Sequence, residues 1–71
     1  MNRDAEVKII FKEKDNIGDH EDMAITDIDI KTAKKIYKKL IHQWKTKRVV
    51  RIDTHAITIA SDAIFMITVR N

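Results

Sequence analysis

The sequence predicts a small α+β domain in which one amphipathic, basic helix lies across a face of a small antiparallel sheet. Short segments of alternating apolar and polar residues stand on both sides of one longer segment with helical spacing. With 71 residues, one glycine, no proline and no cysteine, the chain has room for a single domain, residues 1–71, and a single core. The expected order of elements is β(β)αβββ.

The first strand is predicted over residues 7–12, where the apolar residues Val7, Ile9 and Phe11 occupy every second position. Alternation of this kind points the apolar side chains to one face of a strand. Residues 13–22 are polar and contain the single glycine, so they are predicted to form a loop. Residues 23–28 are a second, shorter candidate strand around Ile25.

The helix is the clearest predicted element, because apolar residues recur at helical spacing from residue 30 onward. This apolar stripe contains Ile30, Ala33, Tyr37, Leu40, Ile41 and Trp44. Two start signals compete. Asp29 can cap the first turn by itself, or Thr26 and Asp29 can form a pair with the spacing of a capping box. In both cases acidic residues lie at the positive end of the helix dipole, and Lys45 and Lys47 lie near its negative end.

Three further strands are predicted after the helix, at residues 48–53, 56–60 and 64–69. The first two are separated by a turn over residues 53–55, which lacks the glycine typical of tight hairpins. Ile57 and Ile59 share one face of the middle strand, and Ser61 and Asp62 interrupt the pattern before the last one.

The last predicted strand is apolar on both faces. One face carries Phe65, Ile67 and Val69, and the other carries Ile64 and Met66. A single helix covers one face of the sheet, so the other apolar face, with Ile10 and Val49 or Val50, needs another cover. Either the chain wraps this strand by itself or a second copy covers it. Because so short a chain has no disulfide to stabilise it, we expect a homodimer.

Charge is distributed unevenly along the chain. Residues 1–30 carry 4 basic and 9 acidic residues, a balance of −5, whereas residues 31–71 carry 10 basic and 2 acidic residues, a balance of +8. The net charge of +3 hides this asymmetry. The acidic half can neutralise the basic half within the fold or across a dimer, or the basic half can remain free for an anionic partner.

The basic half includes a helix without any acidic residue between Lys31 and Lys47. Like charges three or four residues apart cost a few tenths of a kcal/mol each, which ordinary solvated helices relieve with glutamate. The predicted anion-binding residues are Lys31, Lys34, Lys35, Lys38, Lys39, His42, Lys45, Lys47, Arg48 and Arg51. Alternatively, lysine serves here only as a soluble helix former. Lysine suits phosphate contacts, and Gln43 alone on the helix suits base reading, so sequence-specific recognition is not expected.

Catalytic, metal and cofactor sites are not expected. The acidic segment Asp15 to Asp22 does not match a calcium loop, because Ile17 stands at a ligand position. A single glycine excludes a glycine-rich phosphate loop, and Ser61 lacks the glycines of a nucleophile elbow. His42 and His55 fall on different predicted elements, and there is no cysteine. We therefore expect neither an enzyme nor a bound cofactor.

The longest uncharged stretch, Ala63 to Val69, is too short to span a membrane, and the first residues lack the apolar region of a secretory signal. A chain without cysteine is compatible with the reducing cytoplasm. The sequence thus predicts a cytoplasmic, non-enzymatic binding or regulatory protein whose helix docks on nucleic-acid backbone. The alternative is an inhibitor or adaptor of bacteriophage or mobile-element type, which binds a host protein or nucleoprotein through protein–protein contacts.

Overall fold

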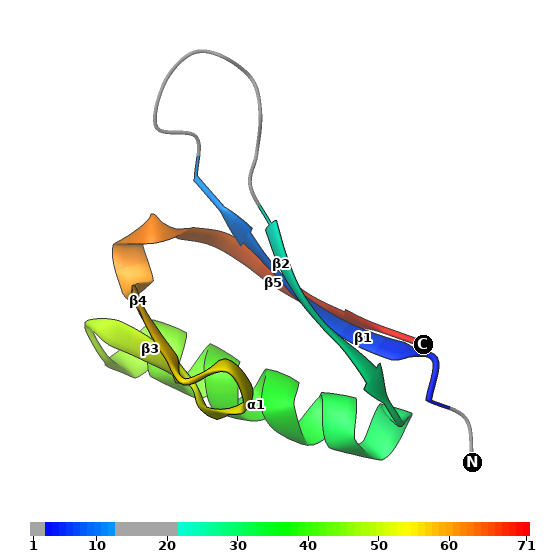
Figure 1. Ribbon diagram of the computed structural model, residues 1–71. Coiled ribbons are helices and arrows are strands. Elements are labelled where there is room, and N and C mark those ends of the chain that lie inside the picture. Colours follow the sequence, from blue (N-terminus) through cyan, green and yellow to red (C-terminus); the bar gives the residue numbers. More distant parts are fainter. Residues whose placement is uncertain (1–2, 13–21) are drawn as a thin grey trace.

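The computed structural model describes residues 3–12 and 22–71, and these confirm the α+β class and the predicted order of elements (Figure 1). The elements are β1 (Ala5–Phe11), β2 (Asp22–Ile28), α1 (Ile30–Thr46), β3 (Val49–Ile52), the 3-10 turn η1 (Asp53–His55), β4 (Ile57–Ala60), the 3-10 turn η2 (Ser61–Ala63) and β5 (Ile64–Arg70). The loop predicted over residues 13–22 lies outside the described residues, except for Asp22, which begins β2.

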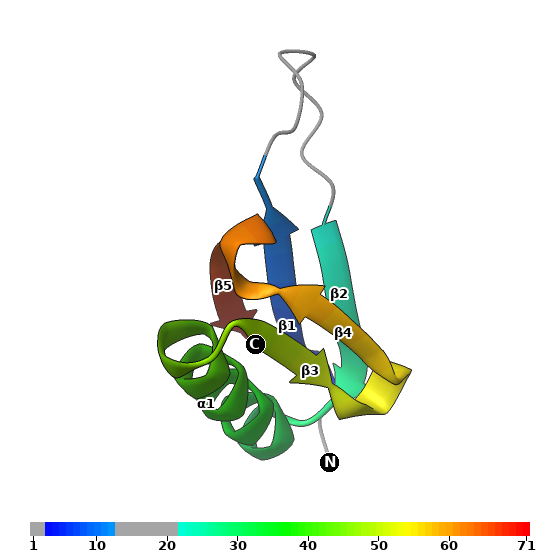
Figure 2. The same ribbon diagram turned by 90° about the vertical axis from the view of Figure 1, so that its left-hand side faces the viewer.

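The strands form two antiparallel sheets. One sheet has the order β2-β1-β5, and the other is the hairpin of β3 and β4. Figures 1 and 2 show α1 and the hairpin side by side on the same face of the three-stranded sheet. The helix therefore crosses this face as predicted, and the hairpin shares the task of covering it.

The core lies between the three-stranded sheet and this covering layer. Its buried apolar residues are Ala5, Val7, Ile9, Ile25, Ala33, Leu40, Val50, Ile52, Ile64 and Ile67. They come from β1, β2, α1, β3 and β5, so every long element contributes to one cluster. The predicted apolar stripe of the helix packs against it, with Tyr37 and Trp44 half-buried.

The distribution of side chains along β5 differs from the simple alternation predicted for it. Ile10 pairs with Met66 and Phe11 pairs with Ile64, so the register shifts and Phe65 forms a bulge. The bulge turns both Ile64 and Ile67 into the core and leaves Phe65 and Met66 at 55% and 41% exposure. The expected grouping of Phe65 with Ile67 on one face is therefore wrong.

The uncovered face of the three-stranded sheet is also more polar than the sequence indicated. Val50, expected there as one alternative, is fully buried in the core. Lys8 points away from buried Val7 and Ile9, and its Nζ lies 4.0 Å from a carboxylate oxygen of Glu6. Ile10 and Met66, which pair across β1 and β5, share this face with the ion pair as the sequence predicted, so the face is partly apolar and partly charged.

The helix begins at Asp29, which decides between the two predicted start signals. The Oδ1 atom of Asp29 accepts a hydrogen bond from the backbone N–H of Thr32 at 3.0 Å. The backbone carbonyl of Asp29 accepts one from the N–H of Ala33 at 2.9 Å. The hydrogen bond from Thr32 is the main cause that lowers the pKa of Asp29, because it favours the ionised carboxylate. Thr26 belongs to β2 and does not cap the helix.

Asp29→Ala is expected to lower the urea midpoint of unfolding at pH 7, and the deficit should shrink in acid. Because the pKa of Asp29 is lowered from 3.8 in the folded state, its stabilisation is complete above that value and is lost as pH falls through the folded pKa. Circular dichroism across pH 2 to 7 measures the effect. Asp29→Asn, which keeps an oxygen acceptor, is the matched control. A deficit for Asp29→Ala that is equal at both ends of the range would contradict this assignment.

Candidate nucleic-acid interface

The helix presents seven of the predicted anion-binding residues on one exposed face, opposite buried Ala33 and Leu40. We call this surface the lysine face. It consists of Lys31, Lys34, Lys35, Lys38, Lys39, His42 and Lys45. From the first to the last of these residues, a rise of about 1.5 Å per residue gives the face a length of about 21 Å. The structure therefore brings these seven residues together as the sequence predicted.

Lys47 and Arg48 follow the helix directly, and Ser61 holds this segment in place. The Ser61 hydroxyl donates to the carbonyl of Lys47 at 2.6 Å, and the Ser61 N–H donates to the carbonyl of Arg48 at 2.8 Å. The indole Nε1 of Trp44 donates in turn to the carbonyl of Ser61 at 3.2 Å. Ser61 is thus a buried residue that fixes the end of the helix, a role that its sequence context did not indicate.

Arg51 reaches the lysine face because β3 lies beside the helix. The side-chain amide of Gln43 donates to the carbonyl of Arg51 at 3.2 Å and accepts from its backbone N–H at 2.9 Å. One amide therefore satisfies both polar groups that Arg51 presents at the edge of β3. Gln43 was the one helix residue suited to reading a base, and both ends of its amide are engaged within the protein.

Asp53 is an acidic group at the border of the lysine face that sequence reasoning did not identify. Its Oδ2 lies 2.7 Å from Nζ of Lys39, and its Oδ1 lies 3.3 Å from Nε of Arg51. The hydrogen bond from Lys39 is the main cause that lowers the pKa of Asp53, and the charges of Lys39 and Arg51 act in the same direction. Lys39 and Arg51 are therefore partly neutralised within the chain.

The other predicted cations have no ion-pair partner within residues 3–12 and 22–71. These are Lys31, Lys34, Lys35, Lys38, Lys45, Lys47 and Arg48. Glu6 and Asp22, from the acidic half of the chain, instead pair with cations on the three-stranded sheet. The Nε of Arg70 lies 3.3 Å from Glu6, and the Nζ of Lys8 lies 3.8 Å from Asp22. These two carboxylates thus form ion pairs on the sheet and do not neutralise the lysine face.

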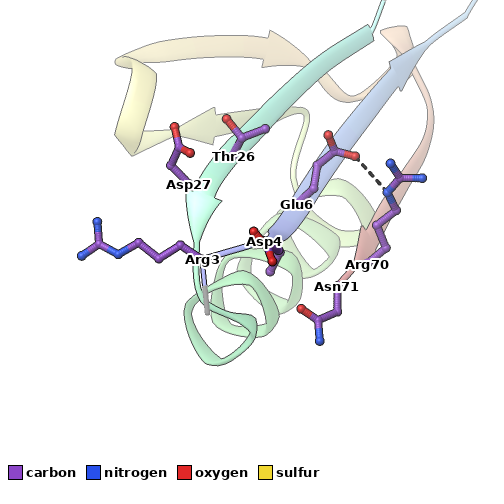
Figure 3. A pocket seen from close by; sticks show the side chains of 8 residues that line it. Arg3, Asp4, Glu6, Thr26, Asp27, Arg70 and Asn71 are labelled. Carbon is purple, nitrogen blue, oxygen red and sulfur yellow. Dashed lines mark ion pairs between the residues drawn. The ribbon is translucent and has the colours of Figure 1, made fainter. Parts of the chain in front are cut away.

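A shallow hollow of about 380 Å³ opens at the end of the three-stranded sheet near Asn71. It is lined by Arg3, Asp4, Ala5, Glu6, Thr26, Asp27, Arg70 and Asn71. Figure 3 shows Glu6 and Arg70 facing each other as an ion pair, while Arg3 extends away from them. Because Glu6 and Arg70 neutralise each other, this hollow does not concentrate charge of one sign as the lysine face does.

The acidic segment considered for a metal ion, residues 15–22, lies outside the described residues except for Asp22. In the described part of the chain, histidine, aspartate and glutamate side chains do not gather in threes to form a metal site. No helix within this part has the length and apolar character needed to cross a membrane. Comparison of the chain with protein-family models, curated proteins and solved structures gives no match.

Proposed function

We propose that this protein is a non-enzymatic, cytoplasmic binding or regulatory protein whose lysine face docks on the backbone of nucleic acid without strong sequence preference. The observation that carries the proposal is the row of lysines along α1, of which Lys39 alone has an ion-pair partner among the described residues. Lys47 and Arg48 extend this surface beyond the end of the helix.

The charge density of the lysine face favours a polyanion as its partner. Neighbours such as Lys34 and Lys38, or Lys31 and Lys35, are four residues apart and repel each other along the helix. A duplex carries one negative charge for about every 1.7 Å of its axis, so a surface of about 21 Å meets many phosphates at once. Docking relieves the repulsion between the lysines and releases counterions from the nucleic acid.

The types of residue on the lysine face favour backbone contacts to a duplex. Lysine binds phosphate as a point charge, and Gln43 is already engaged by Arg51. The two aromatic residues of the helix, Tyr37 and Trp44, pack against the core. Proteins that bind single strands usually stack bases on exposed aromatic side chains, which this helix face does not offer.

Fluorescence anisotropy with labelled duplex DNA, duplex RNA and single strands of unrelated sequence tests the proposal. If five lysines contact phosphates, the logarithm of the association constant should fall with the logarithm of salt concentration with a slope of about −4.5 on duplex DNA. Affinity should differ little between sequences. No binding at tens of micromolar protein and low salt would overturn the proposal and favour the protein-binding alternative.

Asp53→Asn is expected to strengthen nucleic-acid binding, because it frees Lys39 and Arg51 for phosphates. One additional phosphate contact raises the affinity at 0.1 M salt about eightfold, if the variant and the original protein bind equally at 1 M salt. Asp62→Asn removes the same charge from an exposed residue that has no ion pair within the described residues, and it is the matched control. Equal gains from the two variants in anisotropy titrations would argue against a specific role for Asp53.

We also propose that the protein acts as a homodimer, as its sequence led us to expect. The support is its size, because a chain of 71 residues without cysteine has a small core and no disulfide. The uncovered sheet face carries the apolar pair of Ile10 and Met66 beside the ion pairs of Lys8 and Arg70.

A further inference from the structure

The hairpin of β3 and β4 has one buried face and one exposed face. Val50 and Ile52 are buried in the core, and side chains alternate along a strand, so every second residue points outward. The outward residues pair across the two strands, are all exposed, and include no acidic side chain. We call this surface the hairpin face, and it consists of Val49, Arg51, Thr58 and Ala60.

The hairpin face and the lysine face lie on the same side of the molecule. Leu40 of the helix and Val50 of the hairpin belong to one buried cluster with the residues of the three-stranded sheet. Figure 2 shows α1 and the hairpin side by side on one face of that sheet. The sides of both elements that are turned away from the core therefore form one continuous outer surface.

Two side-chain contacts hold the hairpin in place beside the helix. Gln43 of the helix bonds both backbone polar groups of Arg51, and Lys39 of the helix pairs with Asp53 at the end of β3. The position of the hairpin face relative to the lysines is thus fixed in the folded protein. A fixed arrangement of this kind costs little conformational entropy when a partner binds.

The polar side chains of the hairpin face suit contacts to phosphate. The side chain of Arg51 is 71% exposed, and only its Nε is given to Asp53 among the five N–H donors of a guanidinium group. Thr58 stands directly across from Arg51, and threonine hydroxyls commonly donate to phosphate oxygens. Val49 and Ala60 add no charge that repels a nucleic acid.

The two faces together are wide enough to reach both backbones of a duplex. A helix with its side chains is about 10 Å across, and neighbouring strands are about 4.8 Å apart. The lysines of α1 and Thr58 of β4 are therefore roughly 10 to 15 Å apart across the layer. The grooves of a DNA duplex are about 6 Å and about 12 Å wide, so the surface spans a groove.

We propose that the hairpin face is the second half of the nucleic-acid interface, so that α1 contacts one backbone of a duplex while Arg51 and Thr58 contact the other. This inference rests on the proposed function and defines its partner more closely as a duplex held by both strands. Charge complementarity supports it, because the hairpin face adds Arg51 to the lysines without adding an acidic side chain.

Thr58→Lys should raise the affinity for duplex DNA at 0.1 M salt about eightfold, if the variant and the original protein bind equally at 1 M salt. Thr26→Lys is the matched control, because Thr26 is exposed on β2 and lies two positions after Ala24, which pairs with Lys8 on the uncovered sheet face. Anisotropy titrations measure both, and circular dichroism verifies that both variants fold. Equal gains from the two lysines overturn the role of the hairpin face. An original protein that binds no duplex overturns the proposed function itself.

Cross-linking tests the contact to both backbones directly. Because the chain has no cysteine, Lys38→Cys combined with Thr58→Cys gives two defined attachment points for a photoreactive maleimide. With a different dye on each strand of a short duplex, a denaturing gel should show one protein band that carries both dyes. Lys38→Cys combined with Thr26→Cys should give bands with one dye only. A duplex that binds without producing the two-dye band, or produces it equally with both variants, overturns the inference.

Discussion

Replacing both Lys35 and Lys38 by glutamine is expected to weaken binding to duplex DNA about 60-fold at 0.1 M salt. This factor assumes that the variant and the original protein bind equally at 1 M salt, where phosphate contacts contribute least. Both residues lie on the lysine face and have no acidic partner within the described residues. Each phosphate contact contributes about 0.9 to the slope of log affinity against log salt, so the slope should also lose about two units. The loss should be the same for unrelated sequences, because lysine contacts to phosphate carry no base information.

The matched control replaces Lys8 and Lys12 by glutamine and changes the net charge by the same amount. Lys8 lies on the uncovered face of the sheet, where Glu6 and Asp22 surround it, and Lys12 follows the end of β1. Lysine and glutamine have similar helix propensities, so the helix variant should fold normally. If the control pair lowers affinity and slope as much as the helix pair, binding depends on overall charge, and the lysine face is not the interface.

Ile9→Ala is expected to destabilise the fold by about 2 to 5 kcal/mol, the usual range for truncating a buried isoleucine. Ile9 is fully buried in the middle of β1, where it pairs with Met23 on one side and Ile67 on the other. A domain of this size has a stability near the low end of about 5 to 15 kcal/mol, so the loss is a large part of the total. The midpoint of thermal unfolding should fall by about 10 °C or more.

The neighbouring isoleucine provides an internal control for this prediction. Ile10 lies on the same strand but is only half-buried, on the face that points away from the core. Ile10→Ala should therefore cost less than half as much as Ile9→Ala in the free energy of unfolding. Urea and thermal denaturation followed by circular dichroism measure both values. Equal losses would mean that the two faces of β1 do not differ in packing as the structure indicates.

Most of the fold could be predicted from the sequence because it depends on local patterns. The apolar stripe of the helix, the cap at Asp29 and the alternation in β1 are set by residues a few positions apart. The bulge at Phe65 depends on how β5 registers against β1, more than fifty residues away in the chain. A shift of one position there reverses which side chains face the core, and no local pattern reports it.

The candidate site likewise has a part that local sequence patterns predict and a part that depends on tertiary packing. Helical spacing alone places the lysines on one face of α1, so that surface was predictable. Gln43 and Asp53 act on Arg51 and Lys39 only because the hairpin packs beside the helix. Ser61 looked like an interruption between strands, yet its hydroxyl and N–H bind the carbonyls of Lys47 and Arg48. These contacts depend on tertiary packing, which local sequence patterns do not predict.

If nucleic acid binds the lysine face as proposed, folding and binding are thermodynamically linked. An isolated helix with so many like charges and so few compensating pairs would be unstable in water, so α1 depends on the burial of residues such as Leu40. On this proposal the unfolded chain, in which the same lysines are dispersed, is expected to bind a duplex less well than the folded chain. A nucleic acid that prefers the folded form must therefore raise the melting temperature of the protein, by an amount that declines with added salt.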